Sequence, residues 1–341
     1  MFFIVVGHFL IYRQNGIALA KEGQAIGTSR FECLSIILMN IVIIGTNIFF
    51  LISGYFGIHF KIKRFIELVF ITYFYGGVIE LFLLWKGEIS FNTFIFSLVT
   101  LIEKYWFIEV YLLLMLMSVV LNIFIVHITE KLMNSVIIVG FIVLCIYGYI
   151  HDCSRIGVSQ GFSIIWANYL YLVGAKIRTI KIKRIPVVII YLCSTIIYIG
   201  ISLCITFFGK WELYWSFSIA YNNPLVFISS VMMFLLFCSA KNSNNVKANK
   251  IIHFFSSTTI GVYLIHTAPN LNLFQRVDIN YDMDSVGGAS MFFIIVIGGS
   301  GLVYIICSLI DFLRQRKISK VFNRCINNII NKFSEPKETE V

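Results

Sequence analysis

Charge is scarce in this sequence. Lys, Arg, Asp and Glu make up 13% of its 341 residues, against about 25% in an average soluble domain. Hydrophobic residues reach 59%, above the roughly 45–50% of soluble domains, and the mean hydropathy is +0.88. A soluble globule of this length could not bury so much apolar surface, which excludes soluble, disordered, collagen-like and secreted disulfide-rich proteins. The composition predicts an all-α integral membrane protein with many spans.

The signatures of common soluble enzymes are also missing. The sequence has no Walker loop, no GxSxG, no HExxH and no histidine followed by an aspartate five positions later. Its eight cysteines are scattered, mostly within apolar runs, and form no CxxC pair. Free cysteine behaves as a small hydrophobe, so we interpret these side chains as packing residues. We predict no metal site and no permanently bound cofactor.

Nine apolar runs are long enough, or nearly so, to cross a bilayer core of ~30 Å as helices. They cover residues 33–58, 65–85, 106–126, 135–150, 161–178, 186–208, 223–240, 251–269 and 290–313. A shorter run at 91–102 is predicted to lie along the interface or to fold back into the bundle.

The sequence opens with a further apolar run that is only about half as long. Residues 1–12 would rise ~18 Å as a helix before Arg13 interrupts the run. No basic segment precedes it and no small-residue cleavage site follows, so a secretory signal does not fit. We therefore expect a polytopic bundle of about ten transmembrane helices, in which the first helix is truncated and the chain begins partway through it.

The basic residues indicate how this bundle is oriented. With ten spans, nineteen of the Lys and Arg residues fall on one side, which the positive-inside rule assigns to the cytoplasm together with both termini. This bias explains most of the net charge of +10, so we predict no nucleic-acid partner. Localisation in the cell membrane follows.

The last part of the chain has a different pattern. Residues 314–333 combine basic residues with Ile and Phe at helical spacing, which is typical of an amphipathic helix on an anionic inner leaflet. We therefore divide the chain into a membrane domain at 1–313 and a cytoplasmic basic tail at 314–341. The longest outer loops have only about twenty residues, so any chemistry must lie in the bundle or at its mouths.

Ionisable groups within membrane spans are costly and are therefore candidates for function. His8 lies in the truncated first run, and imidazole is the side chain best suited to take a proton from a hydroxyl near neutral pH. The alternative is a structural hydrogen bond to a neighbouring helix. Tyr263 and His266 are three residues apart on one helix face near the outer end of their span.

Two further segments combine small, basic or aromatic residues. Ser53-Gly54 allows close backbone approach between membrane helices, and Ser53 could also contact a ligand. The KIKR loop at 61–64 follows on the cytoplasmic side, where its cations either set the topology or hold a phosphorylated ligand. At the outer end of the fourth span, Trp106 suits an interfacial belt, but Glu109, one turn inside, does not.

Taken in order, these segments resemble the acyltransferase-3 family of polytopic membrane acyltransferases. The matching pieces are IVVGHF around His8, FFLISGYF at 49–56 followed by KIKR, YWFIEVYLLLMLMSVVLN at 105–122, YLYLVGAKIR at 169–178 and GVYLIH at 261–266. The resemblance implies an O-acyltransferase that moves an acyl group, usually acetyl, from cytoplasmic acetyl-CoA to a hydroxyl of an extracytoplasmic or lipid-linked polysaccharide, such as a capsule, exopolysaccharide or cell-wall glycan.

The resemblance also implies roles for residues on the donor side. His8 would act as general base on the acceptor hydroxyl or carry the acyl group transiently. Lys61, Lys63 and Arg64 are assigned to the phosphates of CoA, and Ser53 to the path of the thioester. In the family's Arg-x10-His signature, ten residues separate the arginine from the histidine. If the histidine is His8, the arginine would fall at position −3, before Met1. This departure agrees with a truncated first helix.

On the acceptor side, the expected substrate-binding residues are Trp106, Glu109, Tyr263 and His266. Aromatic faces near the outer mouth suit sugar rings, and Tyr263 or His266 would stabilise the oxyanion. The expected partners are acetyl-CoA, the glycan acceptor and membrane lipids.

Three other functions fit a protein of this composition. A transporter or lipid-linked glycan flippase predicts repeated halves and a charged central cavity, whereas the sequence shows no repeat and few intramembrane charges. A polysaccharide polymerase predicts a large outer loop with arginines. An acyltransferase of the unrelated membrane-bound O-acyltransferase fold would also use a buried histidine. Loss of acyl groups in His8→Ala, with the amount of glycan unchanged, distinguishes acyl transfer from export or polymerisation.

Overall fold

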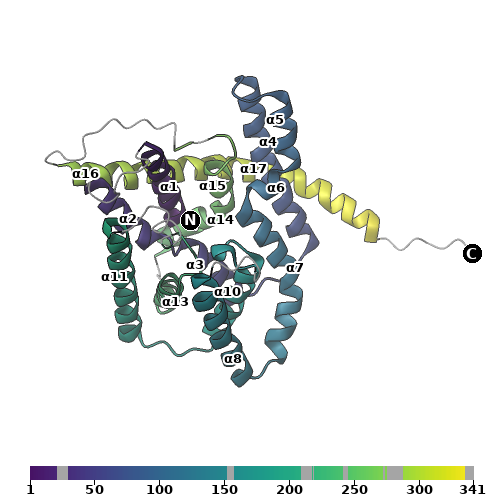
Figure 1. Ribbon diagram of the computed structural model, residues 1–341. Helices are drawn as coiled ribbons and strands as arrows, with labels where there is room; N and C mark the ends of the chain where they lie inside the picture. Colours follow the sequence, from purple (N-terminus) through teal and green to yellow (C-terminus); the bar gives the residue numbers. More distant parts are fainter. Residues whose placement is uncertain are drawn as a thin grey trace, which may run out of the picture.

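The computed structural model describes residues 1–20, 30–151, 157–208, 217, 219–240, 245–271, 273–274 and 287–334. Every regular element among them is a helix, and Figure 1 shows them gathered in one bundle. This confirms the all-α membrane bundle that the composition predicts.

Within the described ranges, six helical segments are long and apolar enough to cross a membrane. They are Glu32–Phe56, Ile62–Trp85, Trp106–His127, Glu130–Ile150, Arg184–Phe208 and Gly288–Ile318. Each of them coincides with one of the predicted apolar runs, and the chain is a multi-pass membrane protein.

Several of these segments are interrupted helices rather than single rods. Glu32–Phe56 comprises α2 (Arg30–Val42) and α3 (Gly45–Phe56), and Glu130–Ile150 comprises α8 (Glu130–Gly140), a π-helical stretch (Phe141–Tyr147) and α9 (Gly148–Ile150). The last span joins α16 (Gly288–Phe293), a second π-helical stretch (Ile294–Gly298) and α17 (Gly299–Ser334). The uninterrupted ones are α4 (Ile62–Trp85), α7 (Trp106–His127) and α11 (Arg184–Phe208).

Shorter helices account for the remaining predicted runs. They are α1 (Phe2–Ala20), α10 (Ile164–Ile177), α13 (Pro224–Cys238), α14 (Val246–Ser257) and α15 (Thr259–His266), with a 3-10 turn at Ser159–Gly161. Helix α1 continues past Arg13 to Ala20, although its apolar part ends at Ile11.

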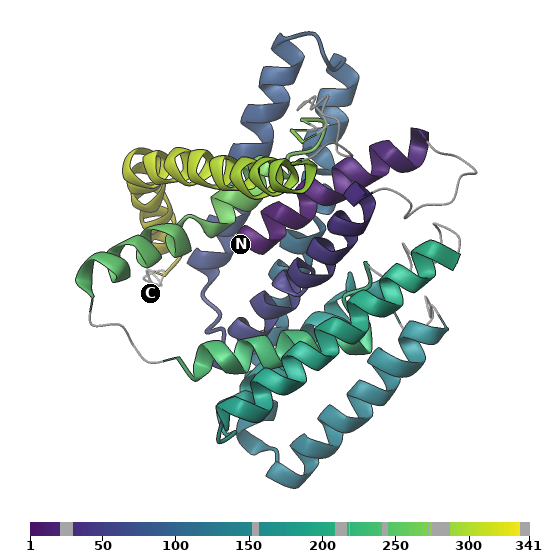
Figure 2. The same ribbon diagram turned by 90° about the vertical axis from the view of Figure 1, so that its left-hand side faces the viewer.

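The run at 91–102 folds back, which is one of its two predicted arrangements. Helix α5 (Phe91–Val99) packs along α4, and the single turn α6 (Leu101–Lys104) leads into α7. Figures 1 and 2 show α4 and α5 side by side, extending beyond the other helices. Gly76 of α4 makes room for the buried side chain of Leu101.

The centre of the bundle is the contact between α3 and α10. A Cβ atom on Gly54 would overlap the carbonyl oxygen of Tyr171, and one on Gly174 would overlap the carbonyl oxygen of Leu51. The two backbones therefore touch, as small residues permit at membrane helix interfaces. This confirms the packing role predicted for Gly54.

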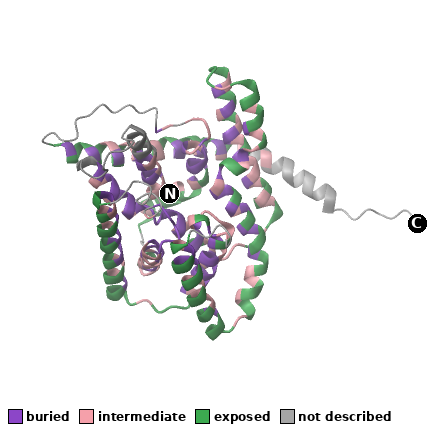
Figure 3. Ribbon diagram, viewed as in Figure 1, coloured by how far each residue is buried: buried purple, intermediate pink, exposed green. Residues whose placement is uncertain are grey.

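Apolar side chains cover both the inside and the outside of the bundle. Trp166, Tyr171 and Phe50 are completely buried, whereas Ile196 and Phe208 of α11 are among many large apolar residues that are exposed. Figure 3 shows buried residues where helices meet and exposed residues along the outer helices. An outer surface of this kind is suited to lipid rather than water.

Candidate functional site

Two histidines from opposite ends of the sequence meet inside the bundle. His8 on α1 and His266 at the end of α15 approach with Nδ1 of His8 2.9 Å from Nε2 of His266. The side chain of His266 is 2% exposed, and His8 is half-buried. The structure therefore brings together two of the residues that the sequence predicts for the site.

The hydrogen bonds of this pair assign its tautomers. Nδ1 of His266 lies against the carbonyl oxygen of Val262, one turn earlier on α15. A carbonyl can only accept, so Nδ1 of His266 carries the proton and its Nε2 carries a lone pair. That lone pair accepts the Nδ1–H of His8, which places the lone pair of His8 on Nε2. His8 is thus oriented as a base by its partner.

Aromatic rings surround the pair. Tyr263 and Phe274 have ring centroids 6.1 and 6.2 Å from that of His266. The hydroxyl of Tyr105 donates to the carbonyl oxygen of Leu264 at 3.0 Å, which ties the segment before α7 to α15. Because these groups are buried, they hold the imidazole of His266 in place and exclude water from it.

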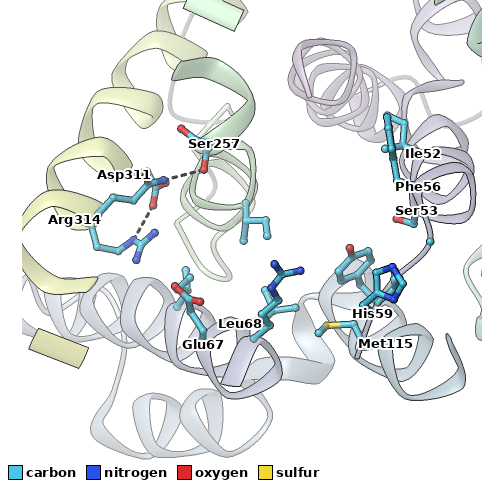
Figure 4. A pocket seen from close by; sticks show the side chains of 17 residues that line it. Ile52, Ser53, Phe56, His59, Glu67, Leu68, Met115, Ser257, Asp311 and Arg314 are labelled. Carbon is cyan, nitrogen blue, oxygen red and sulfur yellow. Dashed lines mark hydrogen bonds and ion pairs between the residues drawn. The ribbon is translucent and has the colours of Figure 1, made fainter. Parts of the chain in front are cut away.

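A separate cavity of about 680 Å³ lies between the cytoplasmic ends predicted for several helices. Figure 4 shows Asp311 and Arg314 on one side of it and Ser53 and His59 on the other, with Glu67 and Leu68 between them. The other lining residues come from α3, α4, α7, α14, α15, α17 and the segment after α3: Ile52, Phe56, Gly57, Ile58, Arg64, Ile71, Tyr111, Met115, Ser257, Ile260 and Gln315.

The segment between α3 and α4 forms one wall of this cavity and is held by three hydrogen bonds. Gly57 adopts a φ of 76°, which only glycine adopts without strain. The backbone N–H of Ile58 donates to the hydroxyl of Tyr171 at 2.8 Å, and Asn122 donates to the carbonyl oxygen of Ile58 at 2.8 Å. The hydroxyl of Tyr171 in turn donates to Asn122 at 2.7 Å. The wall next to Ser53 is therefore fixed.

The opposite wall contains a buried ion pair on α17. Nε of Arg314 lies 2.8 Å from Oδ1 of Asp311, and the two side chains are 7% and 2% exposed. The hydroxyl of Tyr75 donates to the same oxygen at 2.8 Å, and Gln315 donates to Oδ2 at 2.7 Å. A Cβ atom on Gly261 would overlap this carboxylate. The glycine of the GVYLIH segment therefore lets α15 lie directly against Asp311.

A layer of aromatic side chains separates this cavity from the histidines. Tyr111 lines the cavity together with Ser53. Its ring stacks on Phe107 with centroids 5.9 Å apart, and Phe107 lies 5.4 Å from Tyr263, the neighbour of His266. His8 instead lines a second cavity of only about 20 Å³. That volume is close to the space of one water molecule.

The remaining predicted residues lie in different surroundings. Arg64 lines the large cavity, whereas Lys61, which caps the start of α4, and Lys63 in its first turn do not. The ring of Trp106 stacks on Tyr221 with centroids 5.8 Å apart. Glu109 is exposed on α7 and lines neither of these two cavities.

The ion pair of α17 is not among the predicted site residues. From the sequence, Arg314 is assigned to the basic tail and Asp311 is not one of the candidate intramembrane groups. The sequence does contain a signal for this pair. Asp311 lies within an apolar run, and Arg314, three residues later, falls on the same helix face. In the structure the helix runs without a break across residues 313 and 314, so Arg314 belongs to the bundle.

A second buried carboxylate, Glu80, has a structural environment. It is completely buried and accepts two hydrogen bonds from Asn270 at 2.8 and 3.1 Å. Asn270 also donates to Ser97, which accepts from Lys104 at 2.7 Å. This network joins α4 and the α5–α6 segment to the chain just after His266. Within the described part of the chain, no group of three His, Cys, Asp or Glu residues could hold a metal ion.

Comparisons with known proteins identify the family. The acyltransferase 3 family, described as an acyltransferase domain, matches residues 1–311. Searches of curated proteins and of solved structures gave no match. The matched region contains α1 with His8, α15 with His266 and all but two of the residues that line the large cavity. Because the family model matches most of its length, the chain belongs to the acyltransferase 3 family of membrane acyltransferases.

Proposed function

We propose that this protein transfers an acetyl group from cytoplasmic acetyl-CoA to a hydroxyl of an extracytoplasmic or lipid-linked polysaccharide. The observation that carries the proposal is the hydrogen-bonded pair of His8 and His266, whose tautomers direct the lone pair of His8 Nε2 outward from the pair. A neutral imidazole held in this way is a suitable general base for an alcohol.

The proposed reaction is a direct transfer. The acceptor O–H gives its proton to Nε2 of His8 while its oxygen forms a bond to the thioester carbonyl carbon. The tetrahedral intermediate then collapses, the C–S bond breaks, and the CoA thiolate leaves with the proton that His8 releases. His266 acts through His8, because its Nε2 accepts the Nδ1–H of His8 and stabilises the imidazolium that forms.

The cavity of about 680 Å³ supports a donor site separate from the base. Its wall contains Arg64 and Ser53, two of the residues expected to meet CoA. Along α15, Ile260 on the cavity wall and His266 are six residues apart, which corresponds to about 9 Å of helix rise. The acyl end of a donor seated there must pass the layer formed by Tyr111, Phe107 and Tyr263, so a movement of these rings belongs to the catalytic cycle.

The proposed orientation places both termini in the cytoplasm. It rests on the bias of Lys and Arg and on the position of the large cavity, which lies beside the basic first turn of α4. In this orientation the donor enters from the side where acetyl-CoA is made. The protein would act in the plasma membrane on capsule, exopolysaccharide or cell-wall glycan.

The test is a comparison of surface glycan from strains that carry single variants. NMR of the purified glycan should show O-acetyl signals with the wild type and with His253→Ala, an exposed histidine of α14, and none with His8→Ala. The amount of glycan should be the same in all three strains. A loss of glycan itself in His8→Ala would instead support export or polymerisation, and unchanged O-acetylation would refute the role of His8.

A further inference from the structure

We propose that Arg314 and Arg64 form the site that binds the diphosphate of the donor nucleotide, with Asp311 as the residue that positions Arg314. The inference rests on the proposed function, since it concerns the same cavity. It adds a residue pair on α17 to the binding site and names the part of the donor that the pair recognises.

The first argument is the placement of the two guanidinium groups. Arg314 on α17 and Arg64 on α4 both line the cavity, although the two positions are 250 residues apart in the sequence. Figure 4 shows Arg314 beside Asp311 on one wall, facing the side that carries Ser53. A guanidinium presents five N–H donors in a planar fork, which matches phosphate oxygens better than a lysine does.

The second argument is how Arg314 is held. Its Nε donates to Asp311 at 2.8 Å, and the centre of its guanidinium lies 5.8 Å from the centroid of the Tyr75 ring. Asp311 is itself fixed by Tyr75 and Gln315. A buried ion pair rarely improves stability over apolar packing, because desolvation of the two charges offsets their attraction. A pair that is built into the wall of a large cavity is better explained by ligand binding.

The third argument is the charge around the cavity. Two carboxylates, Asp311 and Glu67, line it together with the two arginines. Lys61 and Lys63 add two positive charges at the start of α4, next to Arg64. Cations therefore outnumber carboxylates here, and the charge of Asp311 is already satisfied by three donors. Such an environment favours an anion with more than one charge.

The geometry also fits the distance between diphosphate and thioester. Gly261 lies against Asp311 and precedes His266 by five residues on α15, and Arg314 lies three residues beyond Asp311 on α17. These offsets correspond to a distance of about 7.5 Å along α15 and of about 4.5 Å along α17. The pantetheine arm of CoA can extend over such a distance, so that a diphosphate at Arg314 allows the thioester to reach the histidines.

The experiment measures binding rather than transfer. The full-length protein is reconstituted in nanodiscs, and its affinity for CoA, 3′-dephospho-CoA and pantetheine is determined by calorimetry. The variants are Arg64→Gln, Arg314→Lys and the double variant Asp311→Asn/Arg314→Gln, which removes both charges of the pair. The matched control is Arg316→Gln, because Arg316 is exposed on the same helix and packs over the Phe312 ring at 4.4 Å.

We expect the Kd for CoA to rise about tenfold or more in Arg64→Gln and in the double variant, and less in Arg314→Lys. It should stay within twofold in Arg316→Gln. The same losses should appear with 3′-dephospho-CoA, which keeps the diphosphate, and not with pantetheine, which lacks it. Losses with CoA that disappear with 3′-dephospho-CoA would assign the arginines to the 3′-phosphate and overturn the proposal.

Two further outcomes separate this inference from the proposed function. His8→Ala should bind CoA like the wild type while its transfer activity is lost. If the wild type binds CoA and transfers acetyl groups, but Arg64→Gln and Arg314→Lys both bind CoA with unchanged affinity, only the arginine site is refuted. Because Arg64 is exposed, its replacement is not expected to impair folding, and this variant keeps the test decisive. If the wild type binds no CoA, the donor assignment itself fails.

Discussion

At the scale of single residues, the most informative contact is the one between His8 and His266. A lone imidazole can rotate and exchange tautomers, whereas this one is fixed by a partner that is itself fixed by the carbonyl oxygen of Val262. The chain of hydrogen bonds runs from the backbone of α15 through His266 to His8. In the proposed mechanism, His266 therefore positions His8 instead of making the oxyanion contact expected from the sequence.

Replacement of His266 should therefore lower kcat more than it raises KM for the donor. We expect His266→Leu to lower kcat about tenfold to a hundredfold, since orienting partners typically contribute that much to the group they orient. His266→Gln should recover part of the loss, because its amide oxygen can still accept from His8. Steady-state kinetics of the purified variants check this. Equal losses in Leu and Gln variants would argue against a positioning hydrogen bond.

At the scale of helices, glycines decide which elements touch. Gly54 and Gly174 bring α3 and α10 into backbone contact, and Gly261 brings α15 against Asp311. These contacts set the walls of the large cavity, since α3, α15 and α17 all contribute to it. The small residues in these helices are thus part of the site although they bind nothing themselves.

A direct test of this packing is Gly54→Ala. The added Cβ would meet the backbone of Tyr171, which cannot rotate away, so we expect a loss of at least about 1–3 kcal/mol, typical of overpacking. Thermal unfolding in detergent should show a lower Tm than the wild type. Gly200→Ala is the control, because nothing lies within 4 Å of a Cβ at Gly200. Alanine is the better helix former, so Gly200→Ala should keep or raise the Tm. Equal Tm values for Gly54→Ala and wild type would refute the close contact.

The hydrogen bonds that hold the segment after α3 give a second prediction at this scale. Tyr171→Phe removes the hydroxyl that accepts from Ile58 and donates to Asn122. We expect a loss of about 1–3 kcal/mol in stability and a several-fold higher Kd for CoA, since Ile58 and its neighbours line the cavity. Calorimetry measures both quantities. An unchanged affinity at reduced stability would show that this wall does not shape the donor site.

The positions of the helices follow from the sequence, but the site does so only in part. Hydropathy locates the spans because a bilayer requires long apolar helices whatever their neighbours are. Hydropathy does not reveal the break within Glu32–Phe56 or the π-helical stretch within Glu130–Ile150, because both depend on packing. The meeting of His8 with His266 joins positions 258 residues apart, and no local pattern encodes such a contact.

Other residues show why single positions are harder to predict than spans. Ser53 and Arg64, which the family resemblance assigns to the donor, both line the cavity, while Glu109 on the same helix as Tyr111 is exposed. The spacing along α7 does not reveal which helix face meets the cavity, because both faces of a membrane helix are apolar. The spacing of Asp311 and Arg314 is visible in the sequence, but the contacts of Asp311 with Tyr75 and Gly261 join distant helices and are not.

At the scale of the whole molecule, two compartments are arranged in series. The large cavity lies beside basic helix ends, and beyond an aromatic layer His8 lines a space of about 20 Å³. This division suits a reaction in which a large charged donor stays on one side and only its acyl end reaches the base. It also predicts that the small cavity limits the size of the acyl group.

An enlarged small cavity should accept a longer acyl group. Met39 lines the space around His8, and Met39→Ala removes most of its side chain. We expect the ratio of propionyl to acetyl transfer, measured with the two CoA thioesters, to rise several-fold, in line with about 1–3 kcal/mol per methylene in such a pocket. Leu113→Ala, an exposed position of α7, should leave the ratio unchanged. A ratio that stays constant in Met39→Ala would show that the acyl group does not enter this space.

The central claim is that His8 removes the proton from the acceptor hydroxyl. The most direct measurement is release of free CoA thiol by the reconstituted protein, with acetyl-CoA as donor and non-acetylated glycan from the His8→Ala strain as acceptor. The account predicts glycan-dependent release by the wild type and by His253→Ala, and a loss of about 10²–10⁴-fold in His8→Ala without loss of CoA binding. Glycan-dependent release at the wild-type rate by His8→Ala would contradict it.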